Sequence, residues 1–174
     1  PISLGILPPP GEWGADIVTH SATKYLGGHG TTLGGVIVDA GKFDFGADPE
    51  RFPGFNEPDP SYNGLVYARD LGEGGALGAN LSYILKARVQ LLRDLGSAIS
   101  PFNAFLLAQG IETLSLRLDR HTQNAEKIAK WLEDRPDVSV VHYAGLPSSP
   151  YHELAQKYAP KGTSGVVAFD LDGG

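Results

Sequence analysis

Apolar residues recur at helical spacing over residues 80–95. They stand three or four positions apart, at Leu81, Ile84, Leu85, Val89, Leu92 and Leu95. This period places them on one face of an amphipathic helix. Gly96 follows at the position where a glycine in the left-handed conformation ends many helices. The charged residues of this stretch are expected on the opposite, solvated face; they are Lys86, Arg88, Arg93 and Asp94.

Two further helices are predicted after this one. Ser100 and Pro101 suit the N-cap and the first position of a helix that ends at Gly110. The face expected to enter the core consists of Phe102, Phe105, Leu106 and Gln109. A third helix is expected over residues 113–133, with His121 and Asn124 on its polar side as structural or solvated residues.

Runs rich in β-branched residues predict short strands over residues 15–18, 33–39, 138–143 and 165–171. Glycines bound the run over 33–39, which suits a buried strand. A short helix over residues 151–158 separates the last two strands. This strand–helix–strand alternation after residue 136 predicts the start of a small α/β domain.

Residues 40–78 lack a regular period. Prolines and glycines interrupt this segment throughout, so neither a long helix nor a central strand is expected. The segment nevertheless carries Phe52, Phe55, Tyr62 and Tyr67, which is more aromatic surface than a solvated linker usually keeps. We therefore expect it on the substrate or subunit side of an active site rather than in the core.

Composition limits the classes of function. The 174 residues are 41% hydrophobic, which suits one ordinary core or pieces of two. A net charge of −6 without a Lys/Arg run argues against nucleic acid or an anionic membrane as partner. No apolar run approaches the roughly 18 residues of a membrane helix. The absence of Cys excludes a disulfide, a thiolate metal site and a thiol nucleophile, and no metal is expected.

The sequence also bears on the cellular compartment and on whether the chain is part of a longer protein. The absence of a targeting pattern suggests the cytoplasm. Because Met is absent, Pro1 is not a translation start, and we interpret the chain as an internal piece of a longer protein. Residues 1–11, rich in proline and glycine, are either a loop or residues joined across a gap; the sequence leaves both open.

The candidate chemistry lies in residues 16–30. An apolar strand leads into a polar turn that carries Lys24, preceded by Ser21 and Thr23 and followed by several glycines. Hydroxyls and free backbone N–H groups at such a junction suit a phosphate, and an amine held beside it can act as a nucleophile. A P-loop is excluded because Thr23 stands where that motif needs glycine. By itself, a lone lysine in a Gly-rich loop is usually a solvated surface residue.

The whole string D-I-V-T-H-S-A-T-K-Y-L-G-G-H-G resembles the pyridoxal-phosphate signature of the Cys/Met-metabolism enzymes. That family includes cystathionine synthases and lyases, methionine γ-lyase and O-acetylhomoserine sulfhydrylases. The resemblance implies that Lys24 forms the Schiff base with pyridoxal 5'-phosphate and is catalytic. It also implies that Ser21 and Thr23 hold the cofactor phosphate. His20 and His29 flank the turn and are expected to be mainly structural.

The same resemblance implies the architecture. The fold would be the aspartate-aminotransferase-like α/β fold (fold type I). Residues 1–112 would form the C-terminal portion of the large cofactor-binding domain, and residues 113–174 would begin the small C-terminal domain. The groups that contact the pyridine nitrogen, the ring face and the substrate carboxylate would lie outside this chain. The family also implies a homotetramer, a dimer of dimers, with the active site at a subunit interface.

The subfamily is indicated by E-P-D-P-S-Y-N-G-L at residues 57–65, which resembles the O-acetylhomoserine sulfhydrylase branch. This implies a transferase of methionine biosynthesis that converts O-acetylhomoserine and sulfide to homocysteine and acetate. The sulfur donor and the preferred acyl group stay open. A cystathionine γ-synthase or γ-lyase would share the lysine string. The alternative from another class is a non-catalytic fragment or paralogue that acts only in subunit assembly.

Overall fold

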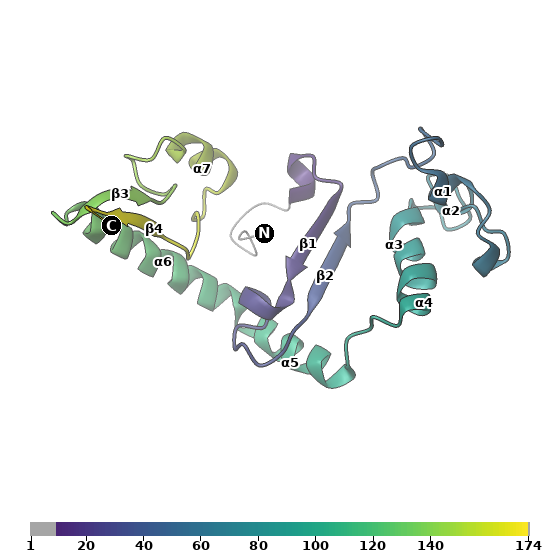
Figure 1. The fold of residues 1–174 in the computed structure, drawn as a ribbon, viewed down its shortest axis with the longest axis horizontal. Coiled ribbons are helices and arrows are strands. Elements are labelled where there is room, and N and C mark those ends of the chain that lie inside the picture. The colour runs from purple at the N-terminus through teal and green to yellow at the C-terminus, as the bar shows by residue number, and fades with distance from the viewer. Residues whose placement is uncertain (1–9, 174) are drawn as a thin grey trace. The chain divides into compact units, whose positions relative to one another are not determined.

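The computed structural model describes residues 10–173, which form two compact units (Figure 1). The first unit contains residues 10–13, 19–36 and 101–173, and the second contains residues 14–18 and 37–100. This division differs from the sequence-based domain boundary near Glu112, which stays a prediction. Of the segment 1–11, residues 1–9 lie outside the described part, and Pro10–Trp13 form a short 3-10 helix, η1.

Strand β1 (Ile17–Ser21) pairs with β2 (Gly35–Asp39). The strands run antiparallel, because Thr23 N donates to Gly34 O at one end and Ala40 N donates to Asp16 O at the other. Strand β1 begins and ends later in the sequence than the predicted strand over 15–18, and Ser21 is its last residue. The prediction of a buried second strand was wrong. Its valines and isoleucine are more than 40% exposed, because the sheet has only these two strands among the described residues.

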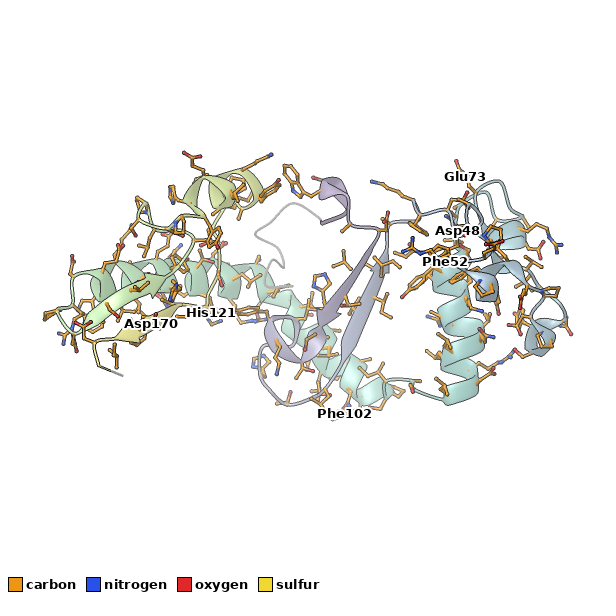
Figure 2. The ribbon with its side chains drawn as sticks, turned by 45° about the horizontal axis from the view of Figure 1, so that its top comes forward. Asp48, Phe52, Glu73, Phe102, His121 and Asp170 are labelled. Carbon is orange, nitrogen blue, oxygen red and sulfur yellow. The ribbon has the colours of Figure 1, made fainter. Side chains whose placement is uncertain are left out.

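The long helices of the first unit are α5 (Pro101–Glu112) and α6 (Leu114–Glu133). Helix α6 confirms the prediction over 113–133, whereas α5 continues past Gly110. The predicted core face of α5 was wrong. Phe102 lies in its first turn, as Figure 2 shows. It is 67% exposed, Phe105 is 54% exposed and Gln109 is also exposed, whereas Leu106 is half-buried. Leu107 and Gly110 are the buried positions instead, because this side of the helix meets the turn after β1.

The C-terminal part of the first unit is a small α/β layer. Strand β3 (Val138–His142) pairs antiparallel with β4 (Ala168–Leu171), and α7 (His152–Tyr158) lies between them in sequence. Helix α6 packs against β3, as Figure 1 shows. The core between them contains Ala125, Ala129, Tyr143 and Leu146. The predicted strand–helix–strand order is confirmed here.

The second unit is built around aromatic residues. Its segment 40–78 contains only short helices: α1 (Pro53–Asn56), the 3-10 helix η3 (Pro60–Tyr62) and α2 (Tyr67–Leu71). Tyr67 is fully buried, and its hydroxyl donates to Asp59 Oδ2 at 2.6 Å. This bond and two from Ser61 lower the pKa of Asp59. Tyr67 is therefore a core residue of this unit, contrary to the expectation for the segment, whereas Phe52 and Phe55 are half-buried and Tyr62 is exposed. The expected place of the segment on the substrate or subunit side of the active site stays a prediction.

The predicted helix over residues 80–95 is a continuous helical stretch, α3 (Ser82–Lys86), η4 (Ala87–Leu92) and α4 (Arg93–Leu95). Gly96 ends it with φ +71°, as predicted. Lys86 is not on a solvated face. Its ammonium lies 4.3 Å from the ring centroid of Tyr67 and 5.4 Å from that of Phe55, and burial lowers its pKa. Helix η4 has π-type hydrogen bonds. Leu92 and Leu95 are exposed, contrary to the predicted buried face, as is every residue from 91 to 100.

None of the helices between residues 10 and 173 combines the length and apolar character that crossing a bilayer requires.

Candidate active site

Lys24 lies in a five-residue π-type turn, η2 (Ala22–Leu26), that follows β1 directly. Its backbone angles, φ −89° and ψ −117°, interrupt the helical geometry of the turn. Ala22 and Leu26 are buried and pack against Leu107, while the Lys24 side chain between them is exposed. The turn is thus anchored by its first and last residues and presents the amine at its centre.

Thr23 fixes the loop that follows the lysine. Its backbone N–H donates to Gly34 O at 3.2 Å, and its hydroxyl oxygen accepts from Gly34 N at 3.0 Å. The same hydroxyl donates to Gly34 O at 3.3 Å. These bonds close the loop of residues 24–33 beside the end of β1. The hydroxyl can keep its bond from Gly34 N and turn its proton to an anion, because a hydroxyl both donates and accepts.

Ser21 is the N-cap residue of η2, and its backbone is extended, with φ −74° and ψ 100°. Its side chain is exposed and makes no capping hydrogen bond to the turn. A capping serine commonly bonds a backbone N–H of its helix. The Ser21 hydroxyl is therefore directed to no backbone group of the turn and is accessible to a ligand.

Glycines follow the turn on its C-terminal side. Gly28 and Gly30 have φ +77° and +65°, the left-handed region that glycine adopts most readily. At Gly30, a Cβ atom would meet nothing within 4 Å. The stretch from Ser21 to Gly30 thus provides an exposed amine, an accessible hydroxyl and open space at Gly30. This donor set fits an aldehyde cofactor with a phosphate group.

The turn lies directly against helix α5. A Cβ atom on Gly110 would collide with the backbone carbonyl of Gly27. A Cβ atom on Gly27 would lie 2.9 Å from a methyl carbon of Leu107. At Gly110 only glycine lets the helix approach the lysine turn this closely, because the atoms that a Cβ would meet belong to the backbone.

Replacing Gly110 with alanine is expected to separate α5 from the turn. Although alanine favours a helix by about 1 kcal/mol over glycine, overpacking costs about 1–3 kcal/mol. We expect a lower unfolding temperature and weaker binding of pyridoxal phosphate in the full-length protein. Gly54→Ala in α1 is the matched control, because its Cβ would meet only ordinary contacts at 3.8 Å. Unchanged melting and cofactor affinity in Gly110→Ala would contradict this packing.

The two histidines beside the turn differ. His20, on β1, has its Nδ1 atom buried without a hydrogen-bond partner among the described residues, and burial lowers its pKa. His29 is exposed in the loop. Farther along the chain, the His121 ring on α6 (Figure 2) lies 5.7 Å from the Tyr25 ring, centroid to centroid. Within residues 10–173, no group of three His, Cys, Asp or Glu residues is arranged to hold a metal ion.

Comparison with known proteins identifies the family. The model of the Cys/Met metabolism PLP-dependent enzymes matches residues 2–174, nearly the whole chain. The chain belongs to this family. It has the pyridoxal-phosphate-dependent α/β fold of these enzymes, as the sequence predicted.

Relatives of this chain are named as homocysteine synthases and O-acetylhomoserine sulfhydrylases. The chain is 53% identical over 170 residues to a homocysteine synthase of Schizosaccharomyces pombe, covering 98% of this chain and 38% of that protein. It is 50% identical over 167 residues to an O-acetyl-L-homoserine sulfhydrylase of Leptospira meyeri, covering 95% of this chain and 37% of that protein. The chain thus spans less than half the length of these relatives.

A solved structure gives the same fold. It is a Campylobacter jejuni protein assigned as an O-acetylhomoserine (thiol)-lyase, with N'-pyridoxyl-lysine-5'-monophosphate in the crystal. The TM-score is 0.81 at 38% identity, covering 95% of this chain and 39% of that one. The cofactor in that protein is therefore joined to a lysine.

The structure brings Ser21, Thr23 and Lys24 onto one turn, as their sequence spacing required. The sequence did not reveal the residues that hold this turn, namely Gly34, Gly110 and Arg117. Gly110 was interpreted only as the end of a helix, and Arg117 was given no role of its own. Their positions in the sequence do not predict these contacts, because the groups that they contact lie on other elements of the fold.

Proposed function

We propose that this chain is the lysine-bearing part of a pyridoxal-phosphate enzyme that converts O-acetylhomoserine and sulfide to homocysteine and acetate. The observation that carries this proposal is the identity of about half the residues, over nearly the whole chain, with proteins named as homocysteine synthases or O-acetyl-L-homoserine sulfhydrylases. The open lysine turn supports it, because such an enzyme needs an amine and a phosphate site together. The segment over residues 57–65 supports the sulfhydrylase branch within the family.

Each site residue has a role in this proposal. Lys24 binds the cofactor covalently, and its amine, once released by substrate, moves protons at the substrate carbons. Ser21 and Thr23 donate hydrogen bonds to the cofactor phosphate, which fixes the cofactor beside the lysine. When bound, pyridoxal phosphate supplies the electron sink that lets the substrate lose its α-proton and its γ-acetoxy group.

The amine also needs shielding from water, because a water-excluded site favours its reaction with the cofactor. Residues 10–173 leave Lys24 exposed, so they do not provide this shielding themselves. We propose that the cofactor and a second subunit cover it in a homotetramer, a dimer of dimers, in the cytoplasm. Within each subunit, residues 1–112 would belong to the large domain and residues 113–174 to the small one.

Product analysis tests the reaction. The full-length enzyme, loaded with pyridoxal phosphate, is incubated with O-acetylhomoserine and either sulfide, cysteine or neither. We expect homocysteine and acetate to form in equal amounts when sulfide is present. A γ-lyase would instead release 2-oxobutyrate and ammonia without sulfide, and a cystathionine γ-synthase would form product only with cysteine. Either of these outcomes, or no turnover at all, would contradict the proposed reaction.

A further inference from the structure

Arg117 connects the lysine turn to the junction of α5 and α6. It is half-buried in the first turn of α6, far from the lysine in sequence. Its Nη1 donates to Tyr25 O at 2.8 Å, and its Nη2 donates to Leu26 O at 3.3 Å. Tyr25 is the residue immediately after Lys24. The guanidinium therefore holds the backbone next to the amine-bearing residue.

The carbonyl groups of η2 show why this contact is needed. Ala22 O accepts from Gly27 N, and Lys24 O accepts from Gly28 N, both at 2.8 Å. The carbonyls of Tyr25 and Leu26 come at the end of the turn, where helical partners run out. Arg117 supplies donors to both, and a cation is favourable at a helical C-terminus. The guanidinium thus completes the hydrogen bonding of the turn.

The same guanidinium also binds the two helices. Its Nη2 donates to Gly110 O at 2.6 Å, near the end of α5, and its Nε donates to Thr113 Oγ1 at 3.1 Å, before the start of α6. A Cβ atom on Gly28 would meet the guanidinium, so glycine at that position leaves the space it occupies. One side chain therefore fixes the turn, the end of α5 and the start of α6 together.

The partners of Arg117 require an arginine. Within residues 10–173, no carboxylate lies at ion-pair distance from it, so its contacts are to neutral oxygens. A guanidinium offers five N–H donors in a rigid planar fork, whereas an ammonium is a single point with three donors. A lysine could reach one of these carbonyls but could not span them all.

We propose that Arg117 is a positioning residue for Lys24: its guanidinium fixes the turn so that the amine meets the cofactor aldehyde in one orientation. The inference rests on the proposed function, in which Lys24 binds pyridoxal phosphate. The hydrogen bonds of Arg117 go to oxygens of the protein itself. It acts through the carbonyls of Tyr25 and Leu26, and misplacement of a reacting group by about 1 Å can cost about a hundredfold in rate.

The test compares Arg117→Met, Arg117→Lys and the control Arg120→Met in the full-length protein. Arg120 is an exposed arginine on the same helix, three residues later. In the apo-proteins, we expect amide exchange at Gly27 and Gly28 to rise at least about tenfold in Arg117→Met. In the loaded enzymes, the visible circular dichroism of the lysine-bound cofactor should weaken. The kcat should fall about ten- to a hundredfold with little change in KM.

Arg117→Lys should lie between the wild type and Arg117→Met in all three measurements, because it keeps the charge and one donor contact. Arg120→Met should match the wild type. If Arg117→Met does not fold, Arg117→Lys decides: wild-type exchange, dichroism and kcat in that variant would overturn the proposal. The same wild-type values in a folded Arg117→Met would also overturn it.

Borohydride trapping separates this inference from the proposed function. In the wild type and in every folded variant, reduction should place the pyridoxyl adduct on Lys24. An adduct absent from wild-type Lys24 would refute the cofactor role of that lysine. Trapping on Lys24 with unchanged glycine exchange in Arg117→Met would refute only the positioning role of Arg117.

Discussion

Lys24→Ala is expected to lower turnover by about a thousandfold or more in the loaded full-length enzyme. The reason is that one amine has two tasks, the covalent attachment of the cofactor and the movement of protons at the substrate carbons. The structure adds that Ala22 and Leu26 anchor the turn, while the Lys24 side chain is exposed. Its removal should therefore leave the fold intact. Steady-state kinetics and a thermal melt of the same sample measure both effects.

Two comparisons sharpen this prediction. A small primary amine added to Lys24→Ala should restore part of the activity, since it replaces the missing proton acceptor. Lys42→Ala, altered outside the turn, should retain activity. Borohydride reduction of the wild type should label Lys24. A pyridoxyl adduct on Lys42 or Lys86, or a Lys24→Ala enzyme with near wild-type turnover, would show that the lysine was assigned incorrectly.

Ser21→Ala is expected to weaken pyridoxal phosphate binding about ten- to a hundredfold. A hydroxyl bound to a charged phosphate oxygen is worth about 1.5–3 kcal/mol, and each 1.4 kcal/mol is about tenfold in affinity. Because the Ser21 side chain makes no capping bond to the turn, its loss should change affinity without changing stability. Titration of the apo-protein with cofactor, followed by visible absorbance, measures the affinity.

Thr23 should behave differently from Ser21, because its hydroxyl also binds the backbone of Gly34. Thr23→Val keeps the shape of the side chain and removes these bonds, so we expect at least the same loss of affinity together with a lower melting temperature. Thr23→Ser should retain most of both, and Thr32→Val in the exposed loop is the control. Unchanged affinity in both Ser21→Ala and Thr23→Val would refute the phosphate site.

The sequence by itself determined the elements and the order of the chemical groups. Gly96 ended its helix because glycine adopts a positive φ at low cost, and this preference is local. The helical period over 113–133 predicted α6 for the same reason. Ser21, Thr23 and Lys24 share one turn because they are close in sequence. Local conformational preferences and the distance between residues along the chain depend on the amino-acid sequence alone.

Only the tertiary structure decided which faces are covered and what the charged groups touch. The helical period placed the phenylalanines of α5 on one side, but it could not show that the lysine turn would meet Leu107 and Gly110 instead. Lys86 fits an exposed helix by its charge, yet it packs over the rings of Tyr67 and Phe55. Arg117 and Tyr25 are 92 residues apart. Such contacts depend on which surfaces approach each other in the folded chain, and no local pattern carries that information.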